Sequence, residues 1–212
     1  MKSFAILGLG RFGQSVAKTL YELGHEVLVI DENENLIQSI SNQITYAMVG
    51  NVTDENVLKT AGIKNFDAAV VSTGKNLESS ILVTQMLKEM GIKHILVKAQ
   101  NELHARVLTK LGADRVVFPE QDMGIRAAHN LVSTNIIDYI ELSPDYTIIE
   151  INAPKRWEGK TLKGLNVRAK HGINIIAIKD GLKINVAPTA DYIIKSDDIL
   201  VVIGSKSDID KL

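Results

Sequence analysis

The sequence predicts an α/β protein in which a doubly wound, parallel, six-stranded sheet is followed by a small, strand-rich α+β C-terminal domain. Short apolar runs alternate with helically spaced segments over the first two-thirds of the chain. A glycine-rich loop directly follows the first apolar run, and short β-branched runs take over after residue 143. Alternation of strands and helices is typical of a parallel sheet with helices on both faces, whereas closely spaced strands indicate a separate unit.

Six apolar runs are the expected strands of the first sheet. Each is almost continuously apolar, as expected of parallel strands that are covered on both faces. Helically spaced residues precede Gly24, Gly91 and Gly112, so helices are expected to end there. The six runs are Phe4–Leu7, Val27–Ile30, Tyr46–Val49, Ala68–Val71, Ile95–Val97 and Val116–Phe118.

The pattern changes after Pro119. Residues Asp122 to Asn135 predict a long helix, and Ile136 to Ile140 continue it with more apolar surface than a solvated helix needs. Two interpretations stay open: a linker packed on its own sheet, or a subunit interface.

The remainder of the chain is expected to form a second domain, small enough to gain stability from pairing. The predicted domains are residues 1–135, which include a crossover helix, and residues 140–212. The expected strands of the second are Thr147–Ile151, Ile173–Ile178, Leu182–Val186 and Ile199–Ile203.

Composition narrows the possible functions. The 212 residues include 24 Lys and Arg against 25 Asp and Glu, and only 5% are aromatic, which argues against a nucleic-acid partner. The absence of cysteine excludes thiol catalysis, disulfides and thiolate metal sites. No apolar run is long enough to span a membrane, and the N-terminus lacks a signal-peptide pattern, so we expect a cytoplasmic protein.

Gly8, Gly10 and Gly13 match G-x-G-x-x-G directly after the first strand and at the start of a helix, which is the Rossmann context. The first glycine permits a tight turn, the second lets a diphosphate approach the backbone, and the third lets the helix lie close to the strand. The N–H groups at the helix start, at Arg11 and Phe12, then bind phosphates.

Asp31 ends the second strand, where a carboxylate accepts hydrogen bonds from ribose hydroxyls and disfavours the 2′-phosphate of NADP. The alternative is that Asp31 only caps the next helix. Arg11 is either a phosphate ligand, in its own site or a neighbour's, or a solvated arginine. Lys98 follows the fifth strand, and Thr73 and Gly74 follow the fourth, at the edge where ligands of such sheets bind.

No residues of this sequence form a recognisable catalytic set. H-x-x-x-H, G-x-S-x-G and the P-loop pattern are all absent. No histidine lies in a motif that pairs it with a catalytic partner, and a solvated or structural role is expected for each. We therefore expect a regulatory nucleotide and no enzymatic activity. The histidines are His25, His94, His104, His129 and His171.

Taken together, these residues resemble the RCK family, whose members regulate the conductance of potassium channels and transporters. They are most similar to the TrkA/Ktr-type cytosolic regulatory subunits of bacterial potassium uptake systems. The resemblance covers nearly the whole chain. It rests on Leu7–Gly13, Val97–Gln100, Leu111–Asp114, Pro119-Glu120 with Asp122–Gly124, and Asp198–Gly204.

The resemblance implies dimers that assemble into an octameric ring beneath a membrane-embedded potassium-conducting partner. It implies ATP or ADP, with NAD(H) as a further candidate, in the N-terminal site. Arg11 would touch the terminal phosphate bound by a neighbouring subunit, assisted by Lys98. Asn51 and Val52 match positions that flank the adenine, and Glu120 matches a carboxylate that coordinates Mg, Ca or Na at the dimer interface.

The C-terminal domains of related Ktr subunits bind cyclic di-AMP, which the resemblance makes a candidate second ligand here. Related domains often carry arginine after the strand, but here Lys179 follows, which keeps the charge and loses the bidentate geometry. The matching positions are Arg168, Asn174, Ile175 and Pro188.

Two other functions stay open. A NAD-dependent oxidoreductase would use the same glycine loop, and a nucleotide-sensing subunit of another ion system would use the same architecture.

Overall fold

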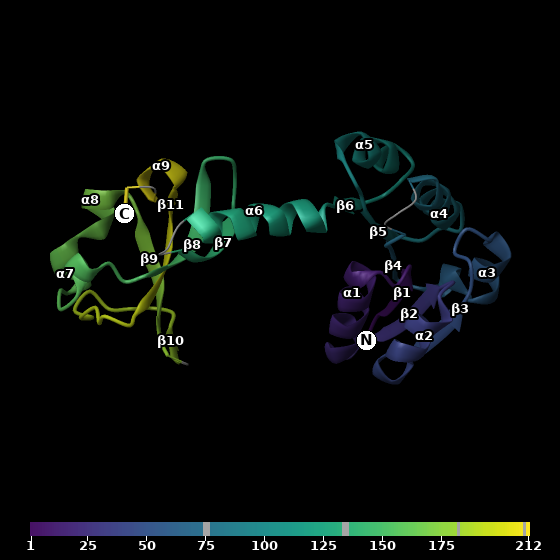
Figure 1. The fold of residues 1–212 in the computed structure, drawn as a ribbon, viewed down its shortest axis with the longest axis horizontal. Helices are drawn as coiled ribbons and strands as arrows, with labels where there is room; N and C mark the ends of the chain where they lie inside the picture. Colours follow the sequence, from purple (N-terminus) through teal and green to yellow (C-terminus); the bar gives the residue numbers. More distant parts are fainter. Residues whose placement is uncertain (74–76, 133–135, 182, 210) are drawn as a thin grey trace. The chain divides into compact units, whose positions relative to one another are not determined.

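The computed structural model describes residues 1–73, 77–132, 136–181, 183–209 and 211–212. Two compact units make up the chain, Met1–Pro119 and Glu120–Leu212, and each is described by itself (Figure 1). The helix after Pro119, which the sequence prediction groups with the first domain, falls in the second unit by this division.

The N-terminal unit contains a six-stranded sheet in the order β3-β2-β1-β4-β5-β6. Every neighbouring pair is parallel, which confirms the predicted doubly wound Rossmann sheet. The strand order reverses between β1 and β4, and the crevice at such a point is where ligands of these sheets bind. The strands are β1 (Ser3–Leu7), β2 (Glu26–Asp31), β3 (Tyr46–Val49), β4 (Ala68–Val71), β5 (His94–Lys98) and β6 (Arg115–Val117).

Helices cover both faces of this sheet. Successive side chains of each strand point to opposite faces, so they pack into two different cores. Ile6 of β1 packs with residues of α1 and α2, whereas Ala5 and Leu7 pack with residues of α3, α4 and α5. Helices α1, α4 and α5 end shortly before the three predicted glycine stops. The helices are α1 (Arg11–Glu22), α2 (Glu34–Ile40), α3 (Glu55–Thr60), α4 (Leu77–Glu89) and α5 (Glu102–Lys110), with short 3-10 helices η1 (Ser41–Gln43) and η2 (Ile63–Asn65).

The segment after β6 corrects one sequence prediction. Helix α6 (Pro119–Val132) begins earlier than predicted, and residues 133–135 lie outside the described residues. Ile136–Glu141 is a strand, β7, and not a continuation of the helix. Its backbone pairs antiparallel with β8 (Tyr146–Asn152), so the prediction that the helix continues through Ile136–Ile140 is wrong.

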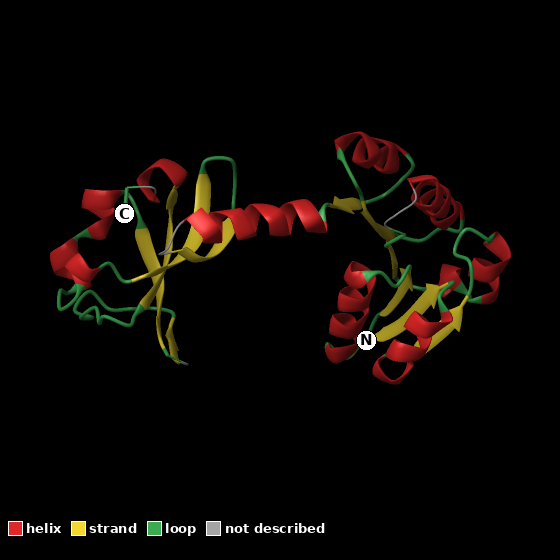
Figure 2. Ribbon diagram, in the orientation of Figure 1, coloured by secondary structure: helices red, strands yellow, loops and turns green. Residues whose placement is uncertain are grey.

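The C-terminal unit contains a five-stranded antiparallel sheet in the order β10-β9-β11-β8-β7 (Figure 2). The short helices η3, α7, α8 and α9 were not predicted from the sequence. Besides β7 and β8, the elements are η3 (Lys155–Trp157), α7 (Leu162–Leu165), α8 (Val167–His171), β9 (Asn174–Asp180), β10 (Lys183–Asn185), β11 (Ile199–Ser205) and α9 (Lys206–Ile209).

One face of the C-terminal sheet is buried and the other is half-exposed. In β11, Leu200 and Val202 are completely buried, whereas Val201 between them is only partly buried. The buried side chains pack around Trp157 and residues of α7, α8 and α9. This alternation is typical of an antiparallel sheet with a core on one side only.

Candidate functional site

The glycine loop connects β1 to α1 and is held against the start of the loop after β4. Gly8 has a φ of +99°, and a Cβ there would lie 2.8 Å from the backbone of Ser72. A Cβ at Gly13 would lie 2.1 Å from the Gly8 carbonyl oxygen, so neither position accepts a side chain. At Gly10 the nearest atom would be 4.0 Å away, which leaves room for another molecule to approach the backbone.

The start of α1 differs from the starts of α2, α3 and α5. A side chain caps α2, α3 and α5, through Asn33, Asp54 and Asn101, and each of these helices has a glutamate in its first turn. Helix α1 begins at Gly10 with no side-chain cap and no acidic residue in its first turn, and the exposed Arg11 is its first residue. The positive end of this helix therefore suits an anion such as a phosphate.

Asp31 is built into the glycine loop. Its Oδ2 accepts a hydrogen bond of 2.6 Å from the Leu9 N–H, and its Oδ1 accepts one of 2.8 Å from the Asn33 N–H. The cap of α2 is Asn33, whose Oδ1 accepts from two N–H groups of that helix. Asp31 is partly exposed, and each carboxylate oxygen has a second lone pair for a ribose hydroxyl.

The loop after β4 contributes a polar group that lacks a partner. The Ser72 N–H donates to the Leu7 carbonyl at 2.7 Å, which holds this loop beside the glycine loop. The Thr73 Oγ1 is buried and has no hydrogen-bond partner within the described part of the chain. Gly74 lies outside the described residues. A buried hydroxyl without a partner is rare, and a ligand atom would satisfy it.

Lys98 is the last residue of β5, at the same edge of the sheet, and it is partly buried and engaged in an interaction. The uncapped helix start, the carboxylate at the end of β2 and the unsatisfied hydroxyl all fit a nucleotide. The structure brings Gly8, Gly10, Gly13 and Asp31 together as the sequence analysis expected.

The two residues expected beside adenine differ in their surroundings. The Asn51 side-chain oxygen accepts hydrogen bonds from the Thr53 N–H at 2.9 Å and from the Thr53 hydroxyl at 2.7 Å. Val52 is 8% exposed and belongs to the core beneath the sheet. Its side chain therefore packs inside the protein, and only Asn51 presents its side chain at the surface.

Glu120 is the second residue of α6 and is exposed, with an interaction of its own. The described residues contain no group of three or more His, Asp or Glu side chains that could hold a metal ion. Within those residues, one chain does not assemble a metal site around this glutamate.

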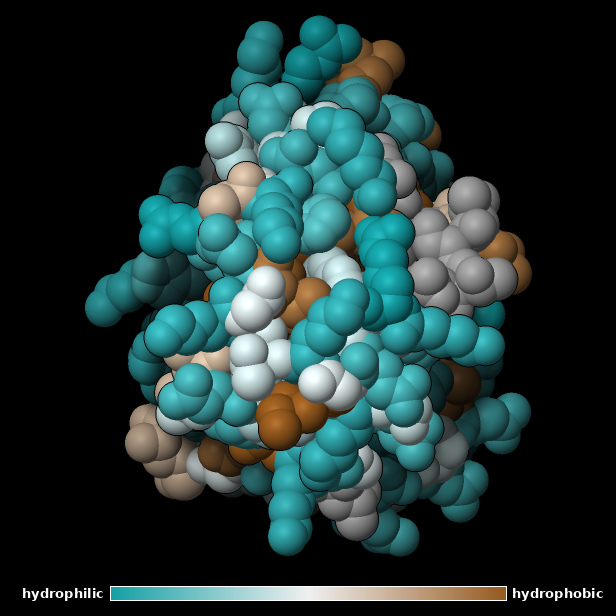
Figure 3. Space-filling model, turned by 90° about the vertical axis from the view of Figure 1, so that its left-hand side faces the viewer, coloured by the Kyte–Doolittle hydropathy of each residue, from teal (hydrophilic) through white to brown (hydrophobic). Residues whose placement is uncertain are grey.

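The candidate residues for a second ligand lie on several elements of the C-terminal unit. Arg168 is exposed on α8, Asn174 and Ile175 begin β9, and Pro188 lies after β10. Among described residues, no hydrogen bond or ion pair connects these four side chains. The side of the unit that includes α7 and α8 is largely hydrophilic (Figure 3).

Lys179 was expected after the strand, but β9 extends through it. Its Nζ forms an ion pair with Glu150 of β8, and both side chains are more than two-thirds buried. The lysine is thus engaged within the sheet.

Of the histidines, His104 is buried, and both of its ring nitrogens have hydrogen-bond partners. Its position on a helix does not predict this burial, and the only local signal is Asn101, which caps α5 three residues earlier.

The sequence matches two family models in series. The TrkA-N domain matches residues 4–119, and the TrkA-C domain matches residues 146–212. The chain is 49% identical over 210 residues to Ktr system potassium uptake protein C of Bacillus subtilis, covering 99% of this chain and 95% of that protein. It is 34% identical over 203 residues to Ktr system potassium uptake protein A of Vibrio alginolyticus, covering 96% and 92%. The chain belongs to the TrkA/Ktr family.

Solved structures with 18% identity share the TrkA/Ktr fold. The GsuK RCK domain aligns with a TM-score of 0.69, covering 99% of this chain and 46% of that one. The GsuK channel bound to NAD aligns with a TM-score of 0.67, covering 98% and 38%. In this TrkA/Ktr member, none of the described helices is long and apolar enough to cross a membrane.

Proposed function

We propose that this chain is a cytosolic, nucleotide-responsive regulatory subunit of a membrane potassium uptake system. In this proposal ATP and ADP bind the N-terminal unit and bias the conformation of an assembly that docks beneath a potassium-conducting membrane subunit. The near full-length identity to Ktr potassium uptake proteins supports the choice of partner.

The observation that carries the proposal is the uncapped start of α1 next to Asp31. The helix start supplies positive potential and N–H donors for phosphates, and the carboxylate supplies acceptors for a ribose. The Thr73 hydroxyl gives the bound molecule one further partner. A nucleotide satisfies all three features at once, whereas an inorganic anion satisfies only the first.

Arg11 is assigned to the terminal phosphate of a nucleotide held by a neighbouring subunit, with Lys98 near the same phosphates. Arg11 is exposed, so its guanidinium can reach a second chain. A bidentate contact to phosphate is the interaction that arginine makes best. ATP would then draw two N-terminal units together more strongly than ADP.

Assembly and cation binding belong to the same proposal. We assign the functional form to dimers that build an octameric ring, with Glu120 coordinating Mg, Ca or Na at a seam between subunits. A seam would complete a site that the described residues of one chain do not form.

The C-terminal unit is assigned a second ligand of the cyclic dinucleotide class, with Arg168 binding a phosphodiester. Arg168 is exposed on α8, whereas Asn174 and Ile175 begin β9 and Pro188 lies after β10. We assign the pocket to two copies of the C-terminal unit.

A NAD-dependent oxidoreductase is the second candidate, because the glycine loop and Asp31 also suit NAD. It requires a proton-transferring side chain near the cofactor. His104 is the buried histidine of this unit, and both of its ring nitrogens are already paired.

A binding panel on the purified protein tests the proposal. Isothermal titration with ATP, ADP, NADH and cyclic di-AMP, combined with the mass of the assembly, should give saturable binding of ATP and ADP to a multimer. Turnover of NADH with a substrate would favour the oxidoreductase. Failure of both adenine nucleotides to bind would refute the proposal.

A further inference from the structure

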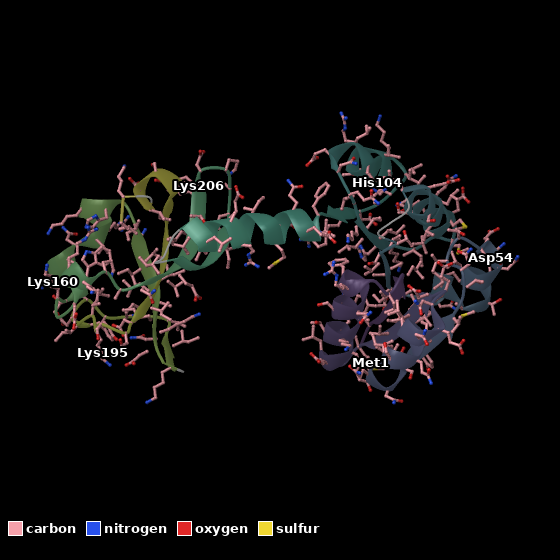
Figure 4. All side chains as sticks on the ribbon, in the orientation of Figure 1. Met1, Asp54, His104, Lys160, Lys195 and Lys206 are labelled. Carbon is pink, nitrogen blue, oxygen red and sulfur yellow. The ribbon has the colours of Figure 1, made fainter. Side chains whose placement is uncertain are left out.

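His104 is a buried titratable side chain to which the nucleotide site described so far gives no role. It is the third residue of α5, it is 4% exposed, and α5 lies beside α4 (Figure 1 and Figure 4). A buried imidazole loses its hydration, so its polar atoms must be hydrogen-bonded within the protein. Here the two ring nitrogens contact two different segments of the chain.

The first contact is to the turn that follows β5. The Gln100 N–H donates to the His104 Nδ1 at 3.3 Å, and Gln100 is two residues beyond Lys98. The Asn101 side chain accepts from the His104 N–H at 2.9 Å, so backbone and ring of one residue together fix this turn. The turn starts at the lysine that is assigned to the phosphates.

The second contact is to the first turn of α4. The His104 Nε2 lies 2.9 Å from the Ser80 Oγ, and the Ser80 hydroxyl donates to the Leu77 carbonyl at 2.8 Å. Since that hydroxyl hydrogen is used, the Ser80 oxygen accepts from the Nε2–H. Nδ1 accepts and Nε2 donates, which is the pattern of one neutral tautomer, assigned from the hydrogen bonds. Burial also lowers the pKa of His104, which favours the neutral ring.

The ring therefore connects the turn after β5 to the first turn of α4. Helix α4 follows the loop that begins with Ser72 and Thr73, and β4 pairs directly with β5. Packing alone does not account for a histidine here, because leucine or methionine fills a similar volume without the cost of burying polar atoms. What the imidazole adds is a fixed spacing between the first turn of α4 and the turn that follows Lys98.

We propose that His104 is a positioning residue of the nucleotide site, which places Lys98 relative to the first turn of α4. The inference rests on the proposed nucleotide binding and adds a residue that acts without touching the ligand. Part of the affinity for ATP then depends on the hydrogen bonds that connect Gln100, His104, Ser80 and Leu77.

A double-mutant cycle on ATP affinity tests this inference. With isothermal titration on the full-length protein, His104→Leu should weaken ATP about tenfold, the equivalent of roughly one or two hydrogen bonds. In a Lys98→Ala background the same substitution should cost less than about twofold, because the residue that it positions is gone. Equal fold-losses in both backgrounds would overturn the inference.

Two further variants separate positioning from stability. Ser80→Ala removes one hydroxyl at almost constant volume, and should weaken ATP in the same direction even if His104→Leu folds poorly. Thr84→Val is the matched control, because Thr84 is fully buried and its hydroxyl donates to the Ser80 carbonyl inside α4. It should lower the unfolding temperature and leave ATP affinity within about twofold.

The outcomes also separate this inference from the proposed function. If the unchanged protein binds ATP and the Ser80 and His104 variants bind it equally well, the inference is refuted and the proposed function stands. If the unchanged protein binds neither ATP nor ADP, both are refuted.

Discussion

The two units bury their sheets differently, and the difference bears on the ligand sites proposed for them. The N-terminal sheet is parallel, and the central residues of β2, Val27–Ile30, are all buried. The C-terminal sheet is antiparallel, and β8 alternates between buried and partly exposed residues. A sheet covered on both faces positions the loops at its edge, where the proposed nucleotide site lies within one chain. A sheet with one half-exposed face leaves its surface available to a second copy.

The two faces of β11 offer the largest expected effect. Leu200 is completely buried, so Leu200→Ala should lower the free energy of unfolding of the C-terminal unit by about 2–5 kcal/mol. Val201→Ala on the other face should cost less than half as much. Urea unfolding can be followed by the fluorescence of Trp157, the single tryptophan, which lies in that core. Equal losses would mean that both faces are buried alike.

Two glycines of the N-terminal loop give a sharper contrast. Gly13→Ala places a Cβ against the Gly8 carbonyl, so it should cost about 3 kcal/mol of stability and abolish nucleotide binding. The Cβ of Gly10→Ala meets no atom nearer than 4.0 Å, so this substitution should leave the unfolding temperature unchanged. It should weaken ATP binding, because the Cβ occupies the space through which the ligand approaches the backbone. Circular dichroism melting and titration calorimetry measure the two effects. A strongly destabilised Gly10 variant would contradict the open approach to the loop.

Asp31 tests the preformed site of the N-terminal unit. Asp31→Ala removes a charged acceptor and should weaken ATP and ADP alike by about 1.5–3 kcal/mol, measured by titration calorimetry. Asn33→Ala is the control, because it removes the cap of α2, costs about 1 kcal/mol of stability and leaves affinity unchanged. Unchanged affinity in the Asp31 variant would limit this carboxylate to a structural role.

The smallest expected effect is the pH dependence that His104 gives the N-terminal unit. Its pKa is lowered by burial from the ordinary 6.5, so the unfolded chain binds the proton more tightly than the folded one. The stabilisation is therefore complete above about pH 6.5 and is lost as the pH falls through the lower folded value. Urea unfolding followed by circular dichroism measures the free energy of unfolding at pH 7.5 and at pH 5.5. This free energy should decrease less between the two pH values for His104→Gln than for the unchanged protein. Equal decreases for the two proteins would contradict a buried, neutral His104 ring.

The sequence allowed most of the first unit to be predicted, because its signals are local. The apolar runs and the glycine loop each fall within a few residues, and all six strands lie within one or two residues of the predicted bounds. β7 was mistaken for a helix for an equally physical reason. Ile136, Tyr139 and Ile140 have the i, i+3, i+4 spacing of a helical stripe, and only the antiparallel pairing with the next strand, β8, resolves the ambiguity.

The candidate site was predictable to the same extent. Gly8 and Gly13 were found from their spacing, because the backbone there accepts no side chain. Asp31 was found from its place at the end of the second strand, and its contact with a ribose stays a prediction. Thr73 was expected at this edge, but the burial of its hydroxyl was not predicted. The contacts of His104 were not predicted either, because Ser80 meets the histidine only after α4 and α5 pack together, and Gln100, four residues away, donates through its backbone and so leaves no signal in its residue type. Hydrogen-bond partners that are distant in sequence leave no periodic signal.

Small-angle scattering of the assembled protein, loaded in turn with ATP and with ADP, tests the central claim most directly. A ligand changes a conformational equilibrium only through its different affinity for the two states. In the proposed function that difference comes from the terminal phosphate of ATP, which is assigned to Arg11. The account predicts two distinct scattering profiles for the unchanged protein, which become one profile in Arg11→Ala. Indistinguishable profiles with both nucleotides bound to the unchanged protein would contradict it.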